Sequence, residues 1–232
     1  MRRSVSSALL GAALLAAPPR VRPPQGFLDQ GILLITRDGN EIGREEFAVR
    51  STAGRRGEGG VLAVATVRYR DRELRAALEL TSDHVPVSYQ LDVTSAGRLA
   101  QRLTGQLGRG RFAVRVVTPS GEVAREFPVP PGAMVLDDDL FSPFYFVPRP
   151  NGRPERISIV RPRQTSVVTG EVSSLGPDTV LVAGHGVQAE RYALVLPGGD
   201  RREFWFSTTG DLLKAAVPAS AIVATRLSLP AR

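Results

Sequence analysis

The most constraining feature of this sequence is a period-two alternation of side chains, broken at short intervals by glycine-containing turns. It is clearest in residues 191–218, where runs at 192–196, 203–206 and 212–216 are separated by Pro-Gly-Gly-Asp and Thr-Thr-Gly-Asp. Successive side chains of a β-strand point to opposite faces, so such runs are typical of strands. Glycine, proline and aspartate tolerate turn geometry. The segment is therefore predicted to be an antiparallel meander.

The same pattern extends over most of the 232-residue chain. It predicts about fifteen short strands spaced roughly 8–12 residues apart, which is typical of all-β folds. We therefore expect an all-β fold: a long antiparallel meander curled into a half barrel or open barrel, with one short capping helix. The side chains predicted to face inward are Leu74, Leu78, Leu80, Tyr89, Leu91, Phe112, Val114, Tyr192, Leu194 and Phe204.

One proline-rich interruption separates the two halves of this pattern. Residues 127–132 (Phe-Pro-Val-Pro-Pro-Gly) cannot continue a central strand. The following segment, 134–147, carries Asp137, Asp138 and Asp139 and then several aromatic residues. Asp139 is predicted to cap a short helical segment near 138–147 whose aromatic side chains pack on the sheet. Two separate strands are expected later, at 165–172 and 179–183.

The N-terminus has the composition of a secretory signal. Arg2 and Arg3 precede a short apolar stretch, Val5 to Ala17, which is too short to span a bilayer. The predicted domains are a signal peptide at 1–17, a proline-rich linker at 18–26 and a single β domain at 27–232. An uncleaved membrane anchor is the alternative for the first segment. The chain has no cysteine, which excludes a disulfide framework and a cysteine-linked lipid anchor.

An exported protein of the periplasm or the extracellular space is therefore expected, peripheral to the membrane at most. An outer-membrane barrel is the alternative, but charges on both strand faces and only 6% aromatic residues argue against it. The formal net charge of +7 raises the question of nucleic-acid binding. Because the basic residues are scattered among 23 acidic ones, no nucleic-acid partner is expected.

No residue pattern in the chain indicates catalysis, and no catalytic residue, metal ligand or cofactor site is predicted. His84 and His185 each lie in turn-like sequence without a second metal-binding residue at a helical or strand spacing. Asp137, Asp138 and Asp139 are candidates for a calcium site, but a solvated, helix-capping turn is the preferred interpretation. No serine lies in a nucleophile-elbow motif.

Aromatic residues provide the remaining candidate site. They line either an apolar ligand cavity or the ordinary core, and both interpretations are open. The candidate ligand-binding residues are Phe141, Phe144, Tyr145, Phe146, Tyr89 and Trp205.

The segments 134–147 and 191–218 resemble those of secreted bacterial β-meander families of unknown function. In these families a hairpin with a tryptophan and a G-x-L-L-K pattern, here Gly210 to Lys214, follows a short helix that begins with aspartate. Such families are similar in architecture to the lipoprotein-localisation carrier superfamily. That resemblance implies a half barrel around an apolar cavity, and it carries no catalytic residues.

The functional hypothesis is a non-catalytic envelope protein that binds a lipid or other apolar ligand in the concave face of the sheet. Small inward residues, Ala63, Ala65 and Ala76, favour incomplete self-filling of that face. One alternative is a hydrolase assembled from His84, His185, Asp137 and Asp138. The other is a structural or interaction module whose barrel is filled by its own side chains.

Overall fold

The computed structural model describes residues 26–53 and 59–229. The predicted signal peptide (1–17) and nearly all of the predicted linker (18–26) lie outside these residues. The described residues form a single sheet of fifteen strands. The strands are β1 (Phe27–Arg37), β2 (Asn40–Thr52), β3 (Gly60–Tyr69), β4 (Arg72–Thr81), β5 (Pro86–Ser95), β6 (Arg98–Gly108), β7 (Arg111–Thr118), β8 (Gly121–Pro128), β9 (Met134–Val135), β10 (Glu155–Arg161), β11 (Ser166–Val182), β12 (His185–Val195), β13 (Arg201–Ser207), β14 (Leu212–Val217) and β15 (Ile222–Arg226).

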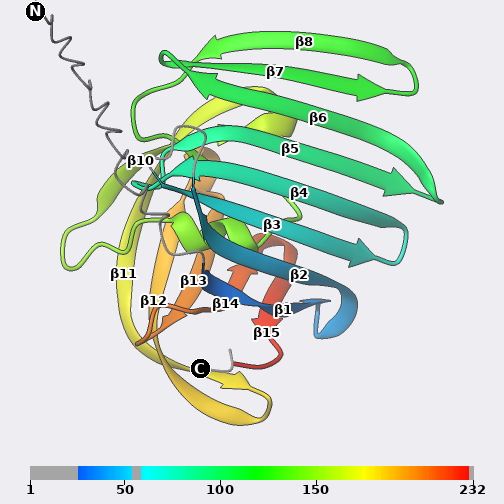
Figure 1. Ribbon diagram of the computed structural model, residues 1–232. Helices are drawn as coiled ribbons and strands as arrows, with labels where there is room; N and C mark the ends of the chain where they lie inside the picture. Colours follow the sequence, from blue (N-terminus) through cyan, green and yellow to red (C-terminus); the bar gives the residue numbers. More distant parts are fainter. Residues whose placement is uncertain (1–25, 54–58, 230–232) are drawn as a thin grey trace, which may run out of the picture.

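Neighbouring strands in the sheet are mostly neighbours in the chain. The spatial order is β8-β7-β6-β5-β4-β3-β2-β1-β15-β14-β13-β12-β11-β10-β9, so the first strand pairs with the last. All pairs are antiparallel except β9 with β10. The sheet curls around an interior but stays open (Figure 1). Its two edge strands are β8 and β9. The predicted all-β open barrel is confirmed.

Alternation along the strands places one face of the sheet in the core. All ten side chains predicted to face inward are buried and belong to one continuous cluster on the concave side. Ala65 is buried there, and Ala63 and Ala76 pack against the cluster. Because burying apolar area contributes roughly 25 cal/mol per Å², this cluster is the main source of stability.

Tight turns with two residues at positive φ join several of these strands. Asp38 and Gly39 (φ 50° and 78°) connect β1 to β2, and Arg109 and Gly110 (φ 51° and 71°) connect β6 to β7. This geometry matches the right-handed twist of the flanking strands.

Two strand predictions need correction. The expected separate strands at 165–172 and 179–183 are one strand, β11, which passes through a register shift between Ser174 and Gly176. Gly176 has a φ of 86°, so it forms a β-bulge and does not reverse the chain. The short strand β9 was not predicted, because two residues carry no detectable alternation.

Helical structure in the described residues is limited to short 3₁₀ segments. These are η1 (Ser142–Phe146), η2 (Pro162–Gln164), η3 (Pro197–Gly199) and η4 (Pro218–Ser220). None of the described helices is long and apolar enough to cross a membrane. η1 is the predicted capping helix, and it belongs to residues 136–147, which we call the plug.

Asp139 does not cap η1. The carboxylate of Glu45 on β2 accepts hydrogen bonds from the backbone N–H groups of Phe141 and Ser142, at 2.7 and 2.8 Å. Asp139 itself has a φ of 69°. The cap therefore comes from a residue about a hundred positions earlier in the chain, which local sequence rules do not detect.

Candidate functional site

The plug contacts the concave face of the sheet through its aromatic residues. The ring of Phe144 stacks on that of Phe204 with centroids 5.6 Å apart, and Phe204 stacks in turn on Tyr192. Phe141 and Phe144 are buried, whereas Tyr145 and Phe146 are half-buried. The apolar end of the plug therefore supplies part of the core that a closed barrel would build from its strands.

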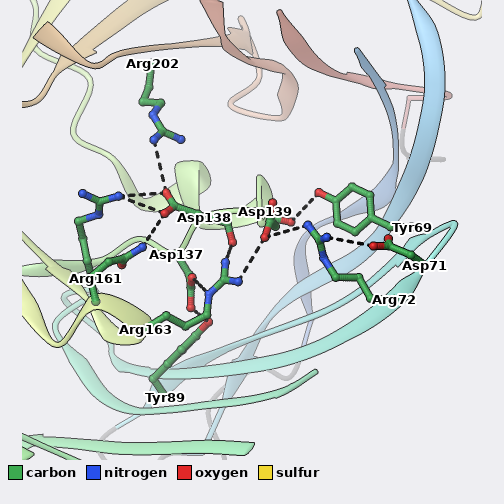
Figure 2. Close-up of polar contacts among 11 residues, drawn as sticks. Tyr69, Asp71, Arg72, Tyr89, Asp137, Asp138, Asp139, Arg161, Arg163 and Arg202 are labelled. Carbon is green, nitrogen blue, oxygen red and sulfur yellow. Dashed lines mark hydrogen bonds and ion pairs between the residues drawn. The ribbon is translucent and has the colours of Figure 1, made fainter. Parts of the chain in front are cut away.

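The other end of the plug is ionic, as Figure 2 shows. Asp138 accepts hydrogen bonds from the guanidinium of Arg161 at 3.1 Å and from that of Arg202 at 3.4 Å. Gln164 donates a third bond to the same carboxylate at 2.6 Å. The three donors come from β10, β13 and η2, so Asp138 connects β13 to β10 and to the 3₁₀ segment that follows β10.

Asp137 is the most deeply placed of the three aspartates, with a side chain that is 0% exposed. It accepts a hydrogen bond from the Tyr89 hydroxyl at 2.8 Å and pairs with Arg163. Asp139 pairs with Arg163 at 3.2 Å and with Arg72 at 3.2 Å. The expectation of a solvated turn at these aspartates is wrong, because their partners are arginines and a tyrosine of the concave face.

Burial and the arginine charges act in opposite directions on these carboxyl groups. Burial raises the pKa of Asp137 above its ordinary value, although Arg163 opposes the shift. For Asp138 burial also acts upward, but the charges of Arg161 and Arg202 outweigh it and the pKa is lowered. Burial raises the pKa of Glu45, against the hydrogen bonds from Ser142 and Phe141. The carboxyl groups that hold the plug therefore have pKa values shifted in opposite directions, upward for Asp137 and Glu45 and downward for Asp138.

Five of the six predicted ligand-binding residues lie on the concave side. Phe141, Phe144, Tyr145 and Phe146 belong to the plug, and Tyr89 reaches the plug from β5 through its bond to Asp137. All five belong to or pack against the main core cluster.

Trp205 lies apart from the other five. It belongs to a second cluster with Val180, Val182, Ala189 and Leu213, on the opposite face of β13 from Phe204 and Phe206. Its indole N–H donates to Asp178 at 2.8 Å, and Lys214 lies over its ring at 4.4 Å. These contacts attach the end of the long β11–β12 hairpin to the outer face of the sheet.

The interior beside the plug is nearly filled. A cavity of about 20 Å³ lies between Asp138, Phe144, Arg161 and Arg202. A space of this size holds about one water molecule. Small inward residues were expected to leave this face incompletely filled, and beside Asp138 and Phe144 the unfilled space has room for about one water molecule.

A larger groove of about 670 Å³ lies on the outer side of β1–β3. Ile32 and Val64 line it, and they alternate along their strands with the buried Leu33 and Ala65. None of the six predicted ligand-binding residues lines this groove.

The histidines and aspartates of the hydrolase alternative lie on three separate segments. His84 is in the β4–β5 turn, where its ring meets the edge of Phe146 at 5.4 Å. His185 begins β12 at an exposed hairpin end. Within the described residues no hydrogen bond joins either histidine to Asp137 or Asp138. The same part of the chain contains no cluster of three or more histidine or acidic residues placed to hold a metal ion.

Sequence reasoning missed the residues that hold the plug: Glu45, Arg161, Arg163 and Arg202. Arginines are frequent and scattered in this chain, so no local signal distinguished these three from the others. The one detectable sign was Glu45, an acidic residue at an inward-facing position of β2. A carboxylate buried at such a position needs a partner.

The comparisons with known proteins bear on the fold. No protein-family model matches the sequence, and no curated protein matches it. A similar solved structure is the crystal structure of a β-barrel-like protein of the domain of unknown function DUF1849 from Brucella abortus. The TM-score is 0.54 at 10% sequence identity, and the match covers 88% of this chain and 97% of that one. At this identity the likeness shows a shared β-barrel-like fold.

Proposed function

We propose that this protein is a non-catalytic, exported binding protein that holds an apolar ligand against the concave face of its sheet. In the described conformation the plug fills the ligand's place. The observation that carries the proposal is that a discrete segment, bounded in sequence by Pro131 and Pro148, covers this face. An apolar chain would displace the aromatic side chains of that segment.

The ionic attachment of the plug supports a movable role. Buried ion pairs stabilise a fold less than well-packed apolar residues of similar volume do, because both charges are desolvated. A permanent plug would be expected to use apolar contacts throughout. Holding the plug by Asp137 and Asp138 leaves an attachment whose carboxylates water solvates well once the plug moves away.

Binding of a fluorescently labelled fatty acid by the purified mature protein tests this function. We expect saturable binding by the wild type and stronger binding by Phe144→Ala, which removes the ring stacked on Phe204. Leu213→Ala is the matched control, since Leu213 is fully buried in the second cluster. Val64→Gln, in the outer groove, is expected to leave binding unchanged.

Absence of binding by both the wild type and Phe144→Ala would refute the carrier function. It would favour the second candidate, a structural or interaction module with a self-filled barrel, which the 20 Å³ interior cavity supports. Loss of binding in Val64→Gln would instead locate the ligand in the outer groove. Cell fractionation with N-terminal sequencing of the mature chain tests export, and recovery only from detergent extracts would contradict it.

A further inference from the structure

The plug combines an anionic head with an apolar tail. Asp137, Asp138 and Asp139 are followed at once by Leu140 and Phe141 and then by Phe144 within η1. The aspartates contact arginines that face the interior (Figure 2). The aromatic residues contact the apolar surface of the sheet. An amphiphile with a negatively charged head and a hydrocarbon tail has this same arrangement of charge and apolar surface.

Arg161 and Arg163 depend on the plug for the negative charges that neutralise them. Within the described residues the guanidinium of Arg163 pairs with the carboxylates of Asp137 and Asp139 and donates to the backbone carbonyl of Asp138, and that of Arg161 pairs only with the carboxylate of Asp138. Both arginine side chains are largely buried, at 19% and 27% exposed. Arg72 and Arg202 also pair with the plug, and each has a second carboxylate, Asp71 or Asp200.

Removing the plug without replacing its charge would leave Arg161 and Arg163 unpaired in a partly desolvated site. A buried charge that loses its partner is strongly unfavourable. A neutral lipid that displaced the plug would create this situation, whereas an anionic one would avoid it. A guanidinium group forms two parallel N–H···O bonds with either a carboxylate or a phosphate, so its geometry suits both anions.

From this arrangement, and resting on the proposed binding function, we infer that the ligand is an anionic amphiphile. Its head group binds Arg161 and Arg163 in place of the plug aspartates, and its chain replaces Phe141 and Phe144. The shared chemistry is an acyl chain with a carboxylate or phosphate head, from a free fatty acid or from a phosphate-bearing lysolipid.

Titration calorimetry of the mature protein with laurate, lauroyl lysophosphatidic acid and methyl laurate, each below its micellar concentration, tests the inference. At about pH 8 the carboxylic acid is ionised and the ester is neutral. We expect at least one of the two anions to bind about tenfold more tightly than the ester, as charge-assisted hydrogen bonds imply. The tighter of the two identifies the source of the head group.

Two variants of opposite charge separate ligand binding from a merely structural role. Arg161→Gln is expected to reduce the preference for the anion over the ester to within about twofold. Asp138→Asn is expected to strengthen anion binding, because the competing carboxylate is gone. A purely structural ion pair would make both variants change binding in the same direction. Thermal melting identifies a variant that does not fold, in which case Arg161→Lys, which keeps the charge, replaces Arg161→Gln and should retain part of the preference.

Arg102→Gln is the charge-matched control, since Arg102 pairs with Asp92 on the exposed side of β5 and β6. It is expected to keep the anion preference. Equal affinity of wild type for anions and ester, or an unchanged preference in Arg161→Gln, would overturn this inference and leave the carrier function standing. Failure of all three lipids to bind would overturn the carrier function itself.

Discussion

Arg226 on β15 and Asp29 on β1 form an ion pair with 2.8 Å between Nη2 and Oδ1, and neither side chain is exposed. Arg226 also donates to the carbonyl of Leu212 at 3.0 Å, while Asp29 accepts from the backbone N–H of Leu212 at 3.1 Å. The pair therefore joins the first, last and penultimate strands at the point where the two ends of the meander meet.

Replacing Arg226 with alanine is expected to destabilise the fold by about 3–5 kcal/mol, because it leaves Asp29 buried without its partner. Urea denaturation measures the change in the free energy of unfolding. Arg102→Ala, which breaks an exposed pair with Asp92, is the control and should have little effect. Equal effects of the two substitutions would show that the buried pair of Arg226 and Asp29 contributes no more to stability than a surface pair does.

Gly105 on β6 faces the ring of Phe112 on β7, and a Cβ at position 105 would overlap that ring. Gly105→Ala is therefore expected to reduce stability by about 1–3 kcal/mol, since the ring must move within a packed core. Gly108→Ala is the matched control on the same strand, because no atom lies within 4 Å of its added Cβ. Combining Gly105→Ala with Phe112→Leu should cost less than the sum of the two single changes, and strict additivity would contradict the contact.

Glu45 should make stability depend on pH. Burial raises its pKa in the folded protein above the ordinary 4.5, so the folded state holds the proton at pH values where the unfolded chain releases it. The contribution of Glu45 to stability is then fully present below about pH 4.5 and declines as pH rises through the folded pKa. In Glu45→Gln, which we expect to be less stable by about 1–3 kcal/mol, this decline is absent.

Urea denaturation of the wild type and Glu45→Gln from about pH 4 to about pH 8 measures this effect. The difference in unfolding free energy between them should shrink as pH rises. A difference that grows with pH would mean that the two N–H bonds from the plug lower the pKa of Glu45 instead.

Trp205 is the only tryptophan in the chain, so its fluorescence reports on one place. Its ring lies in the second cluster, away from the plug. We expect a saturating lipid to leave its emission maximum unchanged, while Asp178→Ala, which removes the acceptor of its indole N–H, shifts the emission. A shift on lipid binding would support the sequence-based prediction that Trp205 contacts the ligand.

The sequence by itself determined the strands and the side of the sheet on which each side chain lies. Leu74, Tyr89, Phe112 and Phe204 were all placed on the buried face correctly. This succeeds because strand periodicity and turn chemistry act between residues that are close in the chain. The bulge at Gly176 was misread as the end of a strand because a glycine in such a run marks either feature.

Only the tertiary structure decided how the plug is held and where the meander joins. Glu45 caps a segment 96 residues away, Asp137 bonds Tyr89 across 48 residues, and Arg226 meets Asp29 across 197. Charged residues at these positions look like ordinary surface residues in the sequence. Their burial follows from the curvature of the whole sheet, which brings β1 against β15 and encloses the plug on its concave side (Figure 1). Local pattern carries no information about such contacts, because they depend on which distant strands become neighbours.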